Sequence, residues 1–428
     1  MTMKGALETE EVKSGYKKTK LGWIPEEWEE RSLSELGTFL KGKGVPKKEI
    51  LEEGLPCLTY GELYKHHHNV IQDFVSFIPE ELAAYSQKLH YGDILFAGSG
   101  ETLEEIGKSA AFVGHFPAFA GGDIIILRQS VCDPTFLGYL LNQDDARRQL
   151  NRLGQGHSVV HIYSSGLGTL KIPIPPLPEQ RAIARILSTW DKAIQTLQKL
   201  IEKKEERKKG LMQVLLSGEV RLEAFSGEWR VNRLEQISQI DAESLSSQTP
   251  KGFRFKYVSL SNAEKGNIIG ELAELTFQEA PSRARRRVKT GDILMSTVRP
   301  NLQGFVHLEN EVDDLVASTG FAVITPNEDI SGRFIFHYLF GRNLSAQLHG
   351  LLVGSNYPAI NSKDVRKLKI KLPSFKEQQK IASVLSAADQ EIERLKDQLT
   401  KLDEQKKGLM QKLLTGEVRV SEELKNGQ

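Results

Sequence analysis

The sequence predicts an α+β (mixed α/β) fold with two pseudo-repeated globular domains, separated by two long helices that form an antiparallel coiled coil. Residues 170–222 and 368–420 align without a gap at an offset of 198, and about half of their positions are identical. Both segments carry apolar residues at spacings that alternate between four and three. The regions before them, 21–169 and 223–367, repeat one order of short apolar runs. The chain is therefore two similar halves, and these two regions are termed the first and second head.

Composition limits the classes of protein to which the chain can belong. A chain of 428 residues suits two or three domains, and 39% hydrophobic with 26% charged residues is typical of a soluble globular protein. Cys57 and Cys132 form no CxxC pair, which favours a reducing, cytoplasmic location. No run of 18 apolar residues and no signal-peptide core is present, so we expect no membrane association. Because the net charge is only +1, any prediction of nucleic-acid binding must rest on local patches.

The first head follows a polar N-terminus, residues 1–20, which we expect to be loosely held. Its short apolar runs between turn residues predict strands, and Pro or Asp before helix-forming residues predicts helices. We expect strands within LPCLTY (55–60), YGDILFAGSG (91–100), AAFVGHF (110–116) and GGDIIILRQ (121–129), and helices over 79–89 and 133–154.

The second head repeats this order with different residues. Trp229 stands where the first head has Trp28, and TGDILMSTVRP (290–300) matches the YGDILFAGSG run. Identity between the two copies falls sharply in the heads compared with the helical segments. This contrast indicates one shared scaffold that carries two separately specialised heads.

The helical segments carry a coiled-coil seam. A sustained 3.5-residue period predicts helices that pack on each other, rather than two amphipathic helices packed only on their own domains. Length supports this, because the predicted helix over 179–216 spans about 57 Å, more than the width of a small domain. The predicted seam consists of Ile183, Leu187, Trp190, Ile194, Leu197, Ile201 and Leu211 in the first copy, and Ile381, Leu385, Ile392, Leu395, Leu399, Leu402 and Leu409 in the second.

Connectivity sets the direction of these helices. The first helix reaches the second head after a short link, 217–228, so the second helix must run back along the first to bury its seam. Each helix ends at a glycine, Gly218 or Gly416, as expected for a C-terminal cap. We expect the packing to loosen where lysines occupy the seam, at Lys204, Lys208 and Lys406. The predicted helical spacers are 170–222 and 368–420, followed by a tail, 421–428.

The sequence offers no recognisable catalytic or metal site. Six residues separate Gly100 from the Gly107-Lys108-Ser109 run, whereas a phosphate-binding loop needs four. The HSVVH segment (157–161) lacks the glutamate of a zinc hydrolase, and the histidines at 66–68 are typical of a polar surface loop. We therefore expect a non-catalytic chain that holds no cofactor and no metal of its own.

Candidate recognition residues cluster in the second head. Arg283, Arg285, Arg286 and Arg287, with Lys289 close by, can neutralise phosphates, although a solvated charged loop is the alternative. In the STVRPNLQG segment, Arg299 and Asn301 flank a proline. Arginine reads guanine and asparagine reads adenine through paired hydrogen bonds in the major groove, whereas the competing interpretation is a structural turn. Ser355, Asn356 and Tyr357 are further candidates on a loop.

The first head offers a different set of polar groups. Tyr60, Tyr64, Lys65 and His67 would provide donors, acceptors and stacking faces on one polar loop. Ser99 lies in a loop of small residues, and the GQGHS segment adds His157 and Ser158 beside two glycines that allow a close backbone approach.

These motifs together resemble the specificity subunit of type I restriction–modification systems. The resemblance covers residues 20–420 and rests on the GWIPEEW start, the GDILFAGSG and GDILMSTVRPNL runs, and the IPIPPLPEQRAIARIL junction followed by KKGLMQVLLSGEVR. The second junction departs from the first, with Lys376 in place of Pro178, but it keeps Glu377 and Gln378.

The resemblance implies a function for each part. Each head would be a target-recognition domain that reads one half of a bipartite double-stranded DNA site. The helices would set the spacing of the half-sites and dock modification subunits, of which we expect two. Those subunits would bring S-adenosylmethionine and methylate adenine, and a separate restriction motor subunit would cleave DNA with ATP and Mg²⁺. The competing hypothesis is a coiled-coil adaptor without a DNA role, with two peptide- or protein-binding heads.

Overall fold

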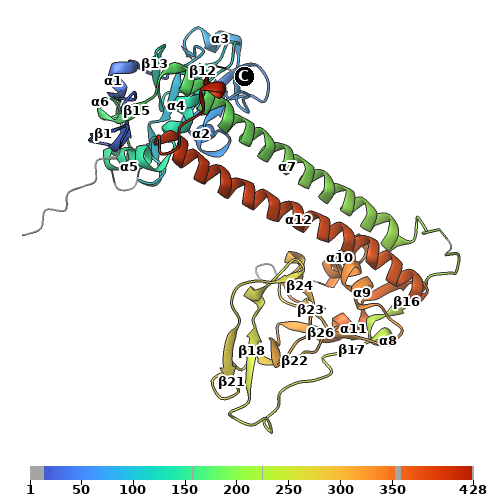
Figure 1. The fold of residues 1–428 in the computed structure, drawn as a ribbon. Helices are drawn as coiled ribbons and strands as arrows, with labels where there is room; N and C mark the ends of the chain where they lie inside the picture. Colours follow the sequence, from blue (N-terminus) through green and yellow to red (C-terminus); the bar gives the residue numbers. More distant parts are fainter. Residues whose placement is uncertain (1–13, 157–158, 224, 352–357, 427–428) are drawn as a thin grey trace, which may run out of the picture. The chain divides into compact units, whose positions relative to one another are not determined.

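The chain folds into two compact units, each built from one head and one end of both long helices (Figure 1). The first unit comprises residues 1–196 with 399–428, and the second comprises residues 197–398. The computed structural model describes residues 14–156, 159–223, 225–351 and 358–426. Each unit therefore takes its helical part from both halves of the sequence.

Two sheets form the first head in the described part of the chain. The first sheet has the order β4-β13-β9-β11-β6 (Gly37–Lys41, Ile124–Gln129, Ile94–Ala97, Ser109–Phe112, Val70–Ile71). The second has the order β7-β5-β12-β8 (Phe77–Ile78, Leu55–Leu58, Phe119–Ala120, Gln87–Lys88). All four residues of β9 are buried, because strands flank it on both sides and apolar clusters cover both faces. This explains why its sequence is an unbroken apolar run.

The second head repeats this topology (Figure 1, yellow to orange). One sheet has the order β17-β26-β23-β24 (Ser238–Ile240, Phe321–Pro326, Ile293–Ser296, Phe305–His307). The other has the order β21-β18-β25-β22 (Ala273–Thr276, Arg254–Val258, Leu315–Ser318, Ala284–Arg287). The parallel pair β5–β12 of the first head recurs as β18–β25. The common strand order confirms that the two heads share one scaffold.

Short elements complete each unit. The two-stranded sheets are β1-β2 (Tyr16–Thr19, Gly22–Pro25), β3-β15 (Glu29–Ser32, Lys171–Ile174), β10-β14 (Ser99–Gly100, Val160–His161), β16-β27 (Arg230–Arg233, Lys369–Leu372) and β19-β20 (Ala263–Glu264, Asn267–Ile268). The short helices are α1 (Leu33–Leu36), α2 (Tyr60–Lys65), α3 (Glu80–Ala83), α4 (Pro134–Leu140), α5 (Asp144–Leu153), α6 (Ser164–Thr169), α8 (Leu234–Ile237), α9 (Gly332–Leu339), α10 (Arg342–Leu351), α11 (Ser362–Lys367) and α13 (Glu422–Lys425).

Two predicted helices are wrong in extent. The helix expected over 79–89 is only the single turn α3, because Gln87 and Lys88 pair with β12 and this tertiary pairing outweighs helix propensity. The helix expected over 133–154 is two helices, α4 and α5. The break lies at residues 141–143, where the side chain of Gln143 accepts the Asp145 amide and caps α5.

The expected chain ends also need correction. Tyr16–Thr19 form β1 and pair with β2, so residues 16–19 are part of the first unit and not loosely held. The predicted tail contains α13, and Val420 just before it is buried in the core of the first unit. The end of the chain therefore packs on the first head.

The two long helices are confirmed as α7 (Leu177–Ser217) and α12 (Phe375–Leu414), and they pair antiparallel in each unit. Each is followed by a glycine in the left-handed conformation, Gly218 at φ 77° and Gly416 at φ 73°, as helix C-terminal caps require. The seam residues of α7 are buried or half-buried, while most residues between them are exposed. The same pattern runs along α12, where Leu395, Leu399, Leu402 and Leu409 are half-buried.

The lysines of the seam do not loosen the packing as predicted. Lys204 and Lys208 on α7 form ion pairs with Glu391 and Asp389 on α12 in the second unit. In the first unit, Lys406 on α12 pairs with Asp191 on α7. A long lysine stem can cover apolar seam surface while its ammonium meets a carboxylate on the facing helix. These lysines are cross-helix contacts.

Candidate nucleic-acid interface and the junctions that support it

A concave face of the first head collects several of the predicted recognition residues. Two cavities, of about 260 Å³ and 600 Å³, share Gly122 and Asp123 in their walls. Ser99 lines the smaller cavity, while Tyr60 and Lys65 line the larger. Lys41, Lys47 and His66 add basic groups to the same walls. Asp123 and Glu62 line the same walls, so the face carries charges of both signs.

The predicted polar loop at residues 60–65 is the helix α2. Thr59 caps it by accepting the Glu62 amide, so Tyr60 and Lys65 project from a rigid element. Tyr60 is 44% exposed. The Tyr64 hydroxyl donates to the carbonyl of Ser99 at 3.1 Å, and burial raises the pKa of Tyr64 to about 12. Tyr64 therefore supports the loop from beneath, and Tyr60 and Lys65 stay candidates for contact.

His67 is not a surface residue, contrary to the prediction. Only 3% of it is exposed, and its Nε2 lies 2.9 Å from Oε1 of the buried Glu62. The same oxygen accepts the Val75 amide. The contact between Glu62 of α2 and His67 just after it anchors the helix in the head. A run of three histidines carries no sequence signal that one of them is internal.

Ser99 pairs with His161, which the sequence analysis weighed only as a metal ligand and not as a recognition residue. Ser99 lies opposite His161 where β10 and β14 pair antiparallel, and Ser99 Oγ is 3.0 Å from Nδ1 of His161. Ser99 is buried, whereas His161 is exposed and lines the smaller cavity. The neighbouring candidates His157 and Ser158 lie outside the described residues, as do Ser355, Asn356 and Tyr357 in the second head.

The basic cluster of the second head lies on and just before the edge strand β22, and its members face different partners. Arg286 is mostly buried and pairs with Asp241 at 2.8 Å, so it is a structural ion pair and not a phosphate contact. Arg285 stacks over Phe277 at 4.8 Å. Arg287 lies 3.9 Å from Glu243 and remains half-exposed. Arg283 is exposed. Because the other three arginines contact protein groups, the basic surface available for a phosphate is smaller than predicted.

Arg299 lies at the tip of a strained loop. Its φ of 49° is left-handed, an unfavourable region for a residue with a side chain, and Gln303 in the same loop has φ 57°. The Arg299 amide donates to the Pro358 carbonyl at 2.8 Å, and Val298 pairs with Ala359. Arg299 and Asn301 are both exposed. The fold thus holds this loop in a costly shape that presents both predicted readers to solvent.

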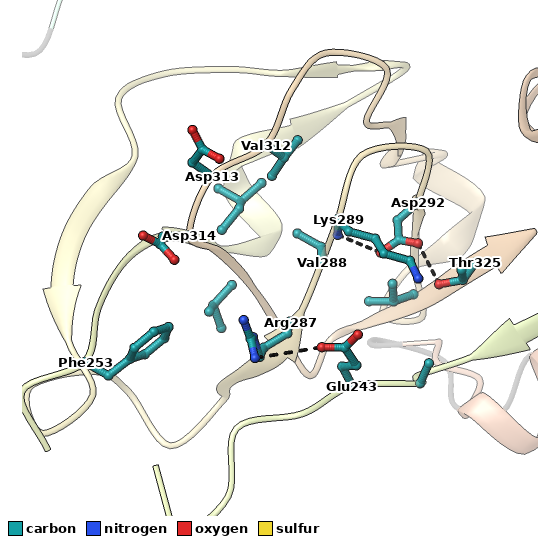
Figure 2. A pocket seen from close by; sticks show the side chains of 14 residues that line it. Glu243, Phe253, Arg287, Val288, Lys289, Asp292, Val312, Asp313, Asp314 and Thr325 are labelled. Atoms are coloured by element: carbon teal, nitrogen blue, oxygen red, sulfur yellow. Dashed lines mark hydrogen bonds and ion pairs between the residues drawn. The ribbon is translucent and has the colours of Figure 1, made fainter. Parts of the chain in front are cut away.

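Both heads have a buried aspartate at the same position of the scaffold, but its hydrogen-bond partner differs between them. In the first head, Arg128 makes two hydrogen bonds to the buried Asp93, at 3.0 and 2.8 Å. In the second head, Asp292 takes the place of Asp93, but its partner is Thr325, whose hydroxyl donates at 2.6 Å. A cavity of about 270 Å³ lies beside Asp292 and Thr325 (Figure 2). Burial raises the pKa of Asp292 above its ordinary value.

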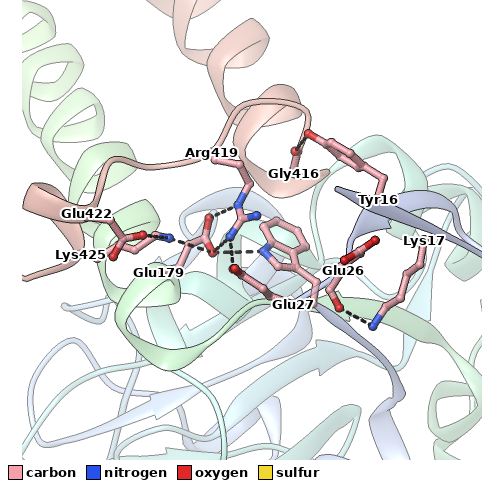
Figure 3. Close-up of polar contacts among 10 residues, drawn as sticks. Tyr16, Lys17, Glu26, Glu27, Glu179, Gly416, Arg419, Glu422 and Lys425 are labelled. Atoms are coloured by element: carbon pink, nitrogen blue, oxygen red, sulfur yellow. Dashed lines mark hydrogen bonds and ion pairs between the residues drawn. The ribbon is translucent and has the colours of Figure 1, made fainter. Parts of the chain in front are cut away.

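Glu179 is the centre of the junction between head and helices in the first unit (Figure 3). Its carboxylate is 1% exposed and accepts hydrogen bonds from Arg419 at 2.8 and 2.9 Å and from Trp28 Nε1 at 3.2 Å. Arg419 also reaches Glu27 at 2.7 Å, and these hydrogen bonds raise the pKa of Arg419. Gly416 packs against Trp28 so closely that a Cβ would lie 3.2 Å from the ring.

The second unit repeats this junction with residues of the other copy. Glu377, also 1% exposed, accepts two hydrogen bonds of 2.7 Å from Arg221, and Gly218 packs on Trp229. Each Glu-Gln pair therefore meets the GEVR segment that ends the opposite helix copy. This explains why the repeat keeps these short motifs identical.

The glutamines of the repeated Glu-Gln pairs join helix to head. Gln180 accepts the Asp133 amide at 2.9 Å and donates to the Pro175 carbonyl at 2.8 Å. Gln378 accepts the Ser331 amide at 3.0 Å and donates to Pro373 at 3.1 Å. Asp133 and Ser331 are the N-caps of α4 and α9, so each glutamine fixes the long helix against the same element of its head.

A second repeated contact ties each head to both long helices. Asp191 accepts hydrogen bonds from Lys406 and from the hydroxyl of Tyr139 in the first unit. At the equivalent place in the second unit, Asp389 pairs with Lys208 and lies 3.8 Å from His337. Tyrosine and histidine thus occupy the same position on the two heads.

His337 makes the second unit sensitive to acid. It is 3% exposed, and burial lowers its pKa to about 4, below the unfolded value near 6.5. Between these values the unfolded chain holds more protons than the folded chain, so stability is lost as pH falls from 6.5 to 4. The shift corresponds to about 3 kcal/mol.

We expect the variant His337→Tyr, which copies Tyr139 of the first head, to lose this part of the pH dependence. Urea unfolding of the variant and the unaltered chain at pH 6.5 and at pH 4.5 measures the difference. Equal losses of free energy of unfolding in the two proteins would contradict a role for His337.

No helix among residues 14–156, 159–223, 225–351 and 358–426 is long and apolar enough to cross a membrane. Over the same described ranges, no group of three or more His, Cys, Asp or Glu residues is arranged to hold a metal ion.

Comparison with known proteins places both halves of the chain in one family. The model of the "Type I restriction modification DNA specificity domain" matches twice, over residues 25–206 and 226–404. The MjaVIII specificity subunit of a type I restriction enzyme from Methanocaldococcus jannaschii is 27% identical over 424 residues, which cover 93% of this chain and 94% of that protein. The EcoKI specificity subunit of Escherichia coli is 22% identical, over 93% and 90% of the two chains.

A solved structure shows a similar fold. The S subunit of a type I restriction-modification system from M. genitalium superimposes with a TM-score of 0.57 at 19% identity. The match covers 90% of this chain and 96% of that one. The pairing of two heads with two long helices is therefore a fold that both chains adopt.

Proposed function

Since this chain belongs to the type I restriction-modification DNA specificity family, we propose that it is the sequence-reading subunit of such a complex. Each head reads one half of a bipartite double-stranded DNA site. The observation that carries this proposal is one scaffold repeated in two heads, with different side chains at equivalent loop positions. Ser99 and His161 in the first head correspond to Val298 and Ala359 in the second. Different chemistry at one place suits two different half-sites.

The long helices set the distance between the half-sites and offer the surface for modification subunits. Most residues of α7 and α12 outside the seam are exposed, and many of the exposed ones are charged. This chain is non-catalytic in the proposal. Methylation with S-adenosylmethionine and cleavage with ATP and Mg²⁺ belong to the partner subunits, and those partners share the phosphate contacts. A net charge of +1 is then compatible with DNA binding.

Co-purification with a methyltransferase, followed by DNA binding at several salt concentrations, tests the function. We expect a partner subunit in the complex, one bipartite methylated motif, and affinity that falls steeply with salt. A chain that binds neither the methyltransferase nor DNA, but captures a peptide through its heads, would be an adaptor instead.

Arg299→Ala tests readout by the second head. If the guanidinium contacts a guanine, discrimination at a single position of one half-site relaxes by about 1–3 kcal/mol, while other positions are unaffected. Methylation of a library randomised over both half-sites measures this. Asn301→Ala is a neighbouring variant that should affect a different base. A loss of binding that is equal for all sequences would mark Arg299 as a phosphate contact.

A further inference from the structure

The wall of the smaller cavity of the first head brings a histidine and an aspartate together. His161 and Asp123 both line this cavity of about 260 Å³, and both are exposed. They flank the same strand segment from opposite sides. The Gly98 amide donates to the Asp123 carbonyl at 2.8 Å, and the Ile162 amide donates to the Gly98 carbonyl at 3.0 Å. These backbone hydrogen bonds therefore fix the distance between the Cα atoms of His161 and Asp123.

Ser99 holds the imidazole of His161 in one orientation. The serine is 8% exposed, and in the described part of the chain the hydrogen bond of its hydroxyl is to Nδ1 of His161, at 3.0 Å. We assign the tautomer in which the serine donates to Nδ1, because a buried hydroxyl that did not donate would leave an unsatisfied donor, which is costly. The hydrogen of the ring is then on Nε2. His161 consequently presents an N–H donor, on a ring that β10 and β14 keep in place.

The second head shows that this pair is not needed by the scaffold. The equivalent strands meet at Val298 and Ala359, which form the same antiparallel bridge without a polar side chain. The backbone bond from Ile162 to Gly98 recurs between Ile360 and Thr297, at 2.9 Å. The loop is thus stable without serine and histidine, so these side chains serve something other than folding.

We propose that His161 and Asp123 read a G·C base pair in the major groove, with Ser99 as the positioning residue. The Nε2–H of His161 donates to guanine O6 or N7, and the Asp123 carboxylate accepts from the N4 amino group of cytosine. Guanine offers acceptors and cytosine a donor at the major-groove edge, which matches the two groups in the cavity wall. Lys41 in the same wall supplies a phosphate contact. The inference rests on the proposed function and names residues and a base pair for it.

The test uses the complete complex with its methyltransferase subunits. Sequencing of methylated sites in genomic DNA first gives the wild-type motif. Duplexes with each base pair at each position of the motif then compete for methylation at one salt concentration. His161→Ala is expected to relax discrimination by about 5- to 150-fold, at a single G·C position of the half-site read by the first head. Asp123→Ala relaxes the same position, and the two effects are not additive because both side chains contact one base pair.

Two further variants separate reading from support. Ser99→Ala keeps the fold but frees the imidazole, so it relaxes the same position less than His161→Ala does. His161→Gln should reduce the preference for guanine over adenine at this position, since glutamine reads adenine through N6 and N7 while Asp123 still favours cytosine on the other strand. Ala359→Ser, at the matching place in the second head, leaves the first half-site unchanged. Thermal unfolding checks that every variant remains folded.

Four outcomes would overturn the inference. An unchanged motif with His161→Ala removes His161 as a reader while the proposed function stands. A loss that is uniform across sequences assigns His161 to phosphate, and relaxation at an A·T position rejects the base assignment. A wild-type complex that methylates no bipartite motif overturns both the inference and the proposed function.

Discussion

Replacement of Arg419 by alanine is expected to destabilise the first unit by about 3 kcal/mol. Glu179 is 1% exposed in the unaltered chain, and among the described residues the variant leaves its carboxylate with Trp28 and, at 3.8 Å, Lys425 as polar partners. A buried charge that loses its partner typically costs 3–5 kcal/mol, and the lower end applies because Arg419 itself is 30% exposed. Urea unfolding followed by tryptophan fluorescence measures the loss. Hydrogen exchange should also rise in residues 415–426, which this contact holds on the first head.

Two controls test the mechanism of this loss. Arg181→Ala removes an exposed arginine that lies two residues after Glu179 on α7, and it should change stability by less than about 0.5 kcal/mol. The double variant Glu179→Gln with Arg419→Ala removes the stranded charge, so we expect it to be more stable than Arg419→Ala alone. A double variant that is less stable than either single variant would show that lost packing, and not the buried charge, dominates.

Removal of one heptad from each long helix should shorten the spacer of the recognised DNA site. Seven residues shorten a helix by about 10 Å, which equals about three base-pair steps. The seam keeps its phase, because a heptad is close to two turns and rotates the helix by only about 20°. DNA turns once in about 10.5 base pairs, so a spacer that is about three base pairs shorter also rotates one half-site about the DNA axis relative to the other. This rotation opposes a shortening by the full three base pairs. We expect a spacer shorter by one to three base pairs, with both half-sites unchanged.

The ion pairs between the helices define where such deletions belong. Residues 195–201 of α7 and 395–401 of α12 each lie between the Asp191–Lys406 pair and the Lys204–Glu391 pair. Deletion from both helices keeps these pairs in register, whereas deletion from α7 alone shifts the seam and serves as the control. Sequencing of methylated sites reads the spacer directly. An unaltered spacer in the double deletion would reject the helices as the element that sets the distance.

The sequence predicted the parts of the fold that repeat or that follow a strict period. Two copies at an offset of 198 predicted two heads of common topology, and the 3.5-residue period predicted α7 and α12. Both signals are carried by many residues, so a few exceptions do not obscure them. Single local signals were weaker. The helix predicted over 79–89 became one turn because β8 gains hydrogen bonds with β12 that the local sequence cannot show.

The structure agrees with only part of the exposure that was predicted for the candidate residues, and their contact with DNA stays a prediction. The structure leaves Tyr60, Lys65, Arg299 and Asn301 exposed, but His67 and Arg286 face buried carboxylates on distant segments. His161 was missed because its signal is not local. It becomes a candidate only when β14 places it opposite Ser99, 62 residues earlier in the chain.

The sequence by itself determined that the chain is a duplicated scaffold with a coiled-coil seam, because repeats and periods are written in the order of residues. Only the tertiary structure decided which residues of one repeat copy contact which residues of the other. Glu179 receives Arg419, and Glu377 receives Arg221, so each unit joins the start of one long helix to the end of the other. Arg419 and its partner Glu179 lie 240 residues apart in the sequence, so the sequence alone does not show that they form a pair. Burial of the carboxylate decides how much this ion pair contributes to stability.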